Sequence, residues 1–123
     1  MRRPALLLVA FACAGALPAQ AAAPLARVQV IALEFHYRLS RVRVPAGPVR
    51  IELVNFGQDE HDLRLGRVGG TTVYQLPRTL PGEHRILTVR LRPGLYRLSC
   101  SIADHAARGM HAQLRARRPP TTA

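Results

Sequence analysis

From Arg27 onward, the apolar residues of this 123-residue chain recur at every second position, and no sustained helical period is present. Val49, Ile51 and Leu53, for example, alternate with charged residues. A period of two places successive side chains on opposite faces of an extended strand. The pattern therefore limits the chain to folds built from β-strands that bury one face.

Several such segments follow one another. Ile31, Leu33, Phe35 and Tyr37 are predicted to share one face of a first extended segment. Further strands are expected over 49–55, 61–65, 87–91, 96–100 and 111–115, whereas the stretch 66–82 shows no clear period. Proline- and glycine-containing turns separate these segments. Six or seven short strands predict an all-β, antiparallel β-sandwich in a single domain, whose thin core leaves little room for a large catalytic cleft.

The amino terminus has a different composition. Two arginines are followed by the uncharged run Ala5–Leu17, and Ala19 and Ala21 supply small residues at the positions that a signal peptidase inspects. Thirteen apolar residues are fewer than the ~17 to 25 that a membrane-spanning helix needs, which disfavours a retained anchor. We therefore expect a secretory signal over residues 1–21, a periplasmic or secreted location, and no membrane span after cleavage.

The remaining chain is expected to consist of one domain over residues 27–116 and a flexible, proline-containing tail over residues 117–123. Its hydrophobic content, 48% in the whole sequence, argues against disorder. All basic residues are arginines, and sixteen of them against seven acids leave a charge of +9 after signal removal. This charge favours an acidic redox partner, such as a cytochrome or oxidase domain, or an anionic membrane surface. The arginines are scattered and the chain is exported, so nucleic acid is not expected as a partner, and we expect a monomer.

Signal removal would leave Cys100 as the single cysteine, and an unpaired thiol in an exported protein requires an explanation. Strand parity directs His61, Cys100 and Met110 toward the core, and His105 lies between the last two in a Cys-x4-His-x4-Met pattern. One thiolate, two imidazoles and one thioether can form a trigonal site with a weak axial ligand. The soft sulfur donors favour copper over hard cations.

At these residues the sequence resembles the type 1 copper proteins, or cupredoxins. Asn55–Asp62 is similar to the family's Asn-x-Gly segment ahead of its first histidine, and Pro93–Met110 is similar to its Pro-Gly-x-Tyr strand and ligand loop. The loop spacing resembles that of rusticyanin and sulfocyanin. The resemblance implies an eight-stranded Greek-key sandwich, copper held by His61, Cys100 and His105 with Met110 as the axial ligand, and single-electron transfer.

Other polar residues near this pattern have less specific roles. Asp62 follows the first histidine and could accept a hydrogen bond from the Ser101 backbone, or it could be a solvated turn residue. The remaining three histidines have outward parity or loop positions and are interpreted as surface residues: His36, His84 and His111.

Two functions are compatible with the same ligands. The first is an exported electron carrier that is not an enzyme, with His105 as the exit route beside the small residues Ala106 and Ala107. The alternative is a periplasmic protein that stores, buffers or delivers copper. Delivery proteins often carry methionine-rich tracts, and Met110 is the single methionine after signal removal, which favours the electron carrier.

Overall fold

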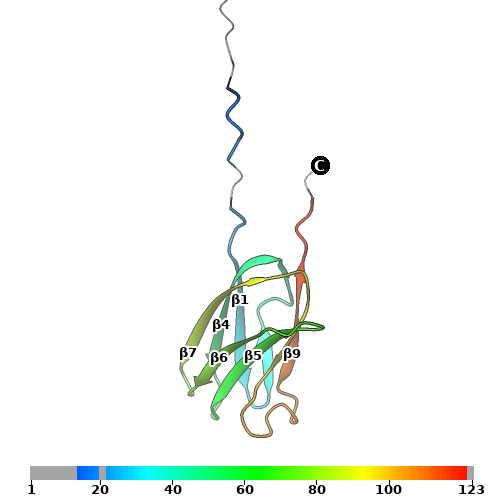
Figure 1. Ribbon diagram of the computed structural model, residues 1–123. Coiled ribbons are helices and arrows are strands. Elements are labelled where there is room, and N and C mark those ends of the chain that lie inside the picture. Colours follow the sequence, from blue (N-terminus) through cyan, green and yellow to red (C-terminus); the bar gives the residue numbers. More distant parts are fainter. Residues whose placement is uncertain (1–13, 20–21, 122–123) are drawn as a thin grey trace, which may run out of the picture.

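The computed structural model describes residues 14–19 and 22–121, so most of the predicted signal segment lies outside the described residues. The regular secondary structure of these residues consists of strands: β1 (Ala26–Leu33), β2 (His36–Leu39), β3 (Arg43–Pro45), β4 (Gly47–Asn55), β5 (His61–Arg67), β6 (Val73–Thr79), β7 (His84–Leu91), β8 (Gly94–Ser99) and β9 (His111–Arg117). They form the all-β sandwich that the two-residue period predicts (Figure 1).

The two sheets are mixed rather than purely antiparallel. One has the strand order β2-β1-β4-β7, and the other has the order β3-β9-β8-β5-β6. The pairs β1/β4 and β3/β9 are parallel, and every other pair is antiparallel. The chain crosses between the sheets five times, after β2, β3, β4, β6 and β7, as in a Greek-key sandwich. The described residues form nine strands, two more than the sequence pattern predicts at most, because the first segment folds back on itself and β3 is too short to show a period.

The first segment is where the expected alternation is wrong. The chain reverses after Leu33, and β2 then pairs with β1 so that Tyr37 lies opposite Ala32. Ala32 and Tyr37 are buried, whereas Ile31 and Leu33 are partly exposed on the other face. A hairpin resets which face each position occupies, so parity counted through it assigns the two halves to the wrong common face.

The stretch without a clear period contains β6, which lies at the edge of its sheet. Only Leu76 and Thr79 are buried in this strand, and Pro77 stands between them. The register with β5 also shifts between His61 and Leu63. The extra residue lies in β6, where Pro77 and Arg78 together oppose Asp62. A bulged edge strand with a proline does not need regular alternation, which explains why the sequence pattern is weak here.

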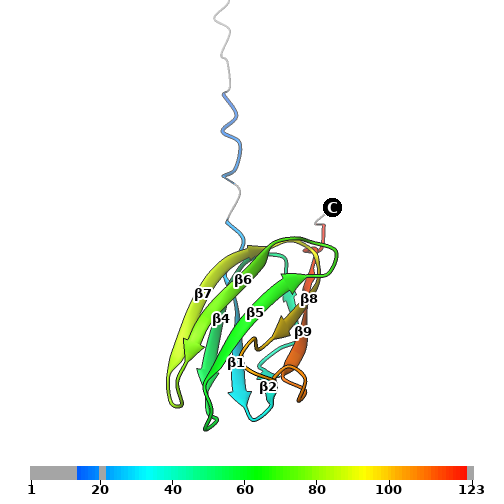
Figure 2. The same cartoon turned by 60° about the horizontal axis from the view of Figure 1, so that its bottom comes forward.

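Four connections gather at one end of the sandwich, which we call the ligand end: the β1–β2 hairpin at 34–35 and the loops 56–60, 80–83 and 100–110. Backbone hydrogen bonds join them, for example from the Phe56 amide to the Ala32 carbonyl and from the Asn55 amide to the Glu83 carbonyl. The chain enters β1 and leaves β9 at the opposite end, which we call the far end (Figures 1 and 2). Among the described residues no helix is long and apolar enough to cross a membrane.

Candidate metal centre

Three of the four predicted ligand residues come from the two central strands of the larger sheet and the loop that follows them. His61 is the first residue of β5, Cys100 directly follows β8, and His105 lies in the loop that leads into β9. The two strands are paired antiparallel, and β5 begins where β8 ends, at the ligand end. They therefore bring residues about forty positions apart into one site.

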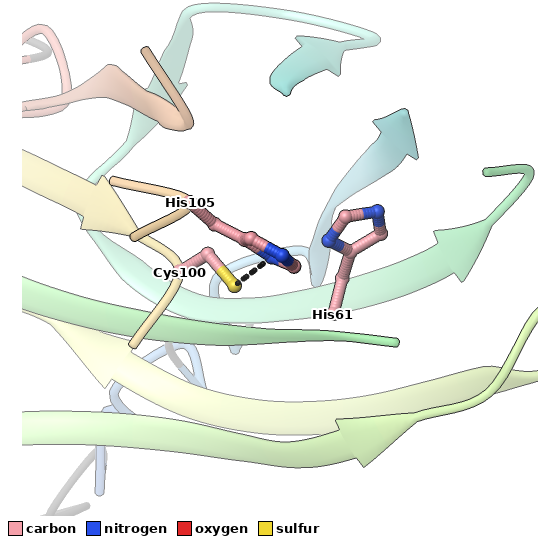
Figure 3. Close-up of side chains that lie close together, drawn as sticks. All are labelled: His61, Cys100 and His105. Atoms are coloured by element: carbon pink, nitrogen blue, oxygen red, sulfur yellow. Dashed lines mark hydrogen bonds between the residues drawn. The ribbon is translucent and has the colours of Figure 1, made fainter. Parts of the chain in front are cut away.

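The structure places the potential ligand atoms of these three side chains within 4.8 Å of one another. Cys100 Sγ lies 3.6 Å from His105 Nδ1, and the two imidazole rings are 5.0 Å apart between centroids (Figure 3). Their exposures are 0% for His61, 2% for Cys100 and 6% for His105. The parity argument therefore placed His61 and Cys100 correctly, and the loop brings His105 to them.

Glu34 is a neighbour of this cluster that sequence reasoning missed. One carboxylate oxygen, Oε1, accepts hydrogen bonds from the amides of Gln58 and Asp59 at 2.7 and 2.9 Å, and it lies 3.1 Å from His61 Nε2. The hydrogen bond from the Asp59 amide is the main cause that lowers the pKa of Glu34 from 4.5 to about 2, against the opposing effect of partial burial. Glu34 is therefore ionised and can only accept hydrogen bonds.

This contact fixes the tautomer of His61. Because the Glu34 carboxylate only accepts, Nε2 of His61 must carry the proton and donate it. In the neutral ring, Nδ1 then presents a bare lone pair. Among the described residues, this Nδ1 is the buried side-chain nitrogen or oxygen atom without a hydrogen-bond partner. Figure 3 shows one ring nitrogen of His61 directed toward Cys100 and His105. An unpartnered lone pair in a buried site indicates a position for an electron-pair acceptor, such as a metal ion.

The approach of Glu34 depends on a glycine. A Cβ atom at Gly57 would lie 2.1 Å from Glu34 Oε1 and 2.8 Å from its carboxylate carbon. No other residue type leaves room for this carboxylate in its observed position. Gly57 itself donates its amide hydrogen to Asn55 Oδ1 at 2.9 Å, which orders the loop that carries the glycine.

Asp62 ties the first histidine segment to the ligand loop, as the sequence analysis suggested. Its Oδ1 accepts a hydrogen bond from the Ser101 amide at 2.7 Å, and its Oδ2 accepts one from the Ser101 hydroxyl. The Tyr37 hydroxyl donates to the Asp62 carbonyl. His61 and Asp62 are both buried although they are consecutive, at the point where the register between β5 and β6 shifts. The solvated-turn alternative for Asp62 is therefore wrong.

Met110 ends the ligand loop and is fully buried. Its amide donates to the His105 carbonyl at 3.0 Å, and its carbonyl accepts from the Cys100 amide at 3.1 Å. The backbone thus closes a compact loop that links all three residues. The axial role of Met110 stays a prediction.

The chemistry of the site fits copper. Burial raises the pKa of the Cys100 thiol, so at neutral pH the metal-free site holds a neutral thiol rather than a thiolate. A soft, thiophilic cation would displace the thiol proton and engage the bare Nδ1 of His61. Two nitrogen donors and one sulfur donor in a buried position are the donor set of a trigonal copper site.

The outer edge of the site is formed around His105. The Phe35 ring lies 4.8 Å from the His105 ring between centroids, and the Arg108 guanidinium lies 4.8 Å from the Phe35 centroid. Asp59 Oδ2 is 3.7 Å from His105 Nε2. Phe35 was expected on a strand face, and only the hairpin turn explains its contact with the site.

The three histidines interpreted as surface residues, His36, His84 and His111, are indeed exposed. The sequence pattern did not associate Glu34 and Phe35 with the site. Only Glu34 had a usable signal in the sequence. It is one of only seven acids in a strongly basic chain, and it interrupts an otherwise apolar segment.

Comparison with known structures places the fold. The chain has the cupredoxin fold of the blue copper proteins, and its His-Cys-His group occupies one end of that sandwich. Auracyanin A, a "blue" copper protein from the green thermophilic photosynthetic bacterium Chloroflexus aurantiacus, is 14% identical with a TM-score of 0.62, over 76% of this chain and 99% of auracyanin A. Rusticyanin from Thiobacillus ferrooxidans is 14% identical with a TM-score of 0.62, over 78% of this chain and 79% of rusticyanin.

Copper nitrite reductase from Nitrosomonas europaea is also similar, at 18% identity and a TM-score of 0.60, but the match spans 80% of this chain and only 44% of the reductase. No protein-family model matches the sequence, and no curated protein matches it. At these identities the comparisons establish the fold, and the site must be argued from the residues of this chain.

Proposed function

We propose that this protein is an exported, single-domain carrier of single electrons, with copper held by His61, Cys100 and His105 and with Met110 as the axial ligand. One observation carries the proposal: the bare, buried Nδ1 of His61 belongs to a cluster in which Cys100 Sγ and His105 supply further donor atoms within 4.8 Å. When bound, copper supplies reversible exchange of one electron between its two common oxidation states.

The chain's own residues suit exchange better than transformation of a substrate. The three donor side chains are buried and their loop is closed by backbone hydrogen bonds, so a small molecule has no route to a vacant position on the metal. We therefore infer that the protein is not an enzyme, despite the partial match to a reductase. His105 has the largest exposure of the three and lies beside the exposed Ala106 and Ala107, where a partner can approach closely.

The partner and location follow from charge and from the amino terminus. Sixteen arginines against seven acids favour a redox partner with an acidic surface, such as a cytochrome or oxidase domain. The apolar, cleavable character of residues 1–21 supports removal of a signal and a periplasmic or secreted location for a monomer. The domain would then comprise residues 27–116, followed by the tail 117–123.

The decisive experiment is the visible spectrum of the copper-loaded protein with a reversible redox titration. We expect a strong thiolate-to-copper charge-transfer band that Cys100→Ser abolishes while the sandwich stays folded. His84→Ala, which removes an exposed histidine, serves as the matched control and should keep the band. A colourless copper-loaded protein would refute the assignment. Loss of copper on every reduction would instead support storage or delivery.

A further inference from the structure

The acids and arginines of this chain are separated along the long axis of the sandwich. Six of the seven acids lie in or next to the connections of the ligand end: Glu34, Asp59, Glu60, Asp62, Glu83 and Asp104. The far-end connections 68–72 and 92–93 contain no acid. In the described residues, the arginines that pair with acids are Arg78, Arg85 and Arg108, all close to the ligand end. The far end is therefore strongly basic.

A pocket of about 330 Å³ opens at this basic end. It lies between the β5–β6 connection and the β7–β8 turn, and its lining includes residues of both sheets. Arg67, Arg90 and Arg92 line it, together with Tyr74, Tyr96 and two threonines of the 68–72 loop. No acid lines the pocket, and none of its three arginines forms an ion pair within the described part of the chain. Three like charges around one hollow repel one another, and an anion would relieve that repulsion.

The pocket walls are held in place by internal contacts. Arg67 Nη1 donates to the Pro93 carbonyl at 3.3 Å, and the side chain crosses Gly94 so closely that a Cβ atom there would lie 3.1 Å from Arg67 Cδ. The buried Tyr96 donates its hydroxyl hydrogen to the Arg92 carbonyl at 2.9 Å, which fixes the turn from the opposite side. The Arg67 guanidinium is thus positioned without an acidic partner, and its other N–H donors are available to a ligand.

We propose that this far-end pocket binds a phosphate group. Guanidinium groups pair with phosphate oxygens through charge-assisted, bidentate hydrogen bonds. The hydroxyls of Tyr74, Thr71 and Thr72 can donate to the remaining oxygens, and the volume accommodates a phosphate together with the group that it esterifies. The same chemistry fits a soluble phosphate and a phospholipid headgroup. Because the pocket is at the end opposite His105, an occupant leaves the electron-exchange surface free.

The test is calorimetric titration of the purified protein with inorganic phosphate, in sodium chloride that keeps the ionic strength constant. We expect saturable binding of one phosphate, weakened roughly tenfold (about 1.4 kcal/mol) by Arg67→Gln, since this variant loses a charge-assisted hydrogen bond to the phosphate. Arg38→Gln removes the same charge from an exposed position outside the pocket and should leave the affinity unchanged. Phosphate should also raise the Tm of the metal-free protein more than chloride of equal ionic strength does.

The proposal is overturned if phosphate and chloride act alike, or if Arg38→Gln weakens binding as much as Arg67→Gln. Either result would show diffuse attraction to a basic surface. Vesicles of anionic phospholipid distinguish the source: sedimentation with them that Arg67→Gln abolishes assigns the pocket to a headgroup, and phosphate binding without vesicle binding assigns it to a soluble ligand. Failure here leaves the copper spectrum untouched, so it is distinguishable from failure of the electron-carrier proposal.

Discussion

Glu34 places a negative charge directly behind His61, and its effect on the site is electrostatic as well as geometric. The carboxylate orients the ring through Nε2 and joins the β1–β2 hairpin to the 56–60 loop through two amides. Carboxylate partners of ligating histidines increase the basicity of the ligand. A more basic ligand and a nearby negative charge both favour the more highly charged oxidation state of a bound metal.

Glu34→Gln should therefore raise the reduction potential of the copper-loaded protein. The amide keeps the shape of the side chain but removes the charge. We expect a rise on the order of 50 mV, about 1 kcal/mol for a one-electron couple, after allowance for solvent screening of a partly exposed group. Potentiometry measures this shift, and Glu52→Gln, which removes a carboxylate from the middle of β4, is the control. An unchanged potential in Glu34→Gln would contradict the electrostatic role.

Gly57→Ala provides an independent way to displace the same carboxylate, because the new Cβ would overlap Glu34 Oε1. It should raise the potential in the wild-type background and have little effect in Glu34→Ala, where the space is free.

In the metal-free protein, the lowered pKa of Glu34 makes the free energy of unfolding depend on pH. Its stabilising contribution is complete above the unfolded value of 4.5 and is lost as the pH falls through about 2. The stability difference from Glu34→Gln should disappear over the same interval.

Met110 is the proposed ligand for which simple core packing is the strongest competitor, since it is fully buried. If it only packs, Met110→Leu conserves volume, costs under about 1.5 kcal/mol of stability and leaves the potential unchanged. If it is axial, its removal destabilises oxidised copper relative to reduced copper, and the potential rises. Met110→Gln should lower the potential, because a harder oxygen donor favours the oxidised ion. A Gln variant with the wild-type potential would show that Met110 is packing.

At the level of strands and loops, the site is a junction between β5 and the 100–110 loop that Asp62 holds together. Both side-chain oxygens of Asp62 accept hydrogen bonds from Ser101, which is next to Cys100. The loop is otherwise held by its own turns and by its return into β9. Its position relative to His61 therefore depends strongly on a single carboxylate.

Asp62→Ala should weaken copper binding about 10- to 100-fold, the range typical for loss of a group that orients ligands. Competition with a copper chelator measures this affinity. Asp104→Ala is the matched control, because it removes an acid from the same loop that forms only an exposed ion pair with Arg108. If both variants keep wild-type affinity, the junction does not depend on Asp62 and the loop is ordered by its backbone alone.

Over the whole molecule, the excess positive charge, +9 if residues 1–21 are removed, lies away from the surface where the electron is expected to leave. The ligand end holds most of the acids, and the arginines spread over the flanks and the far end. Long-range attraction of the proposed acidic partner is then expected from the body of the molecule. Close contact is expected at the small neutral residues beside His105.

Exchange with an acidic redox partner should accordingly slow as ionic strength rises and the screening length falls below ~10 Å. Ala107→Glu, next to His105, should slow exchange further without changing the copper spectrum. Thr88→Glu, which adds the same charge to an exposed position on β7, should affect only the salt-dependent part. Stopped-flow kinetics against salt separates the two contributions. A rate that is flat with salt and indifferent to Ala107→Glu would place the productive surface elsewhere.

Much of the fold and of the candidate ligand set could be predicted from sequence, because both depend on local regularities. The two-residue period specifies strands with one buried face, and short spacing keeps Cys100, His105 and Met110 in one loop. His61 could be added because its strand carries it inward at its start. These features depend on neighbouring residues, and they can be recognised without knowing how the strands are arranged.

The hairpin after Leu33, the contact of Glu34 with His61 and the far-end pocket were decided only by the tertiary structure. The last two join segments that are distant in sequence: Glu34 is twenty-seven positions from His61, and the pocket combines strands of both sheets. Periodicity states which face of a strand is buried, but it contains no information on which other strand lies opposite. That choice is made by packing of the two sheets, and the orientation of His61 and the separation of charge both follow from it.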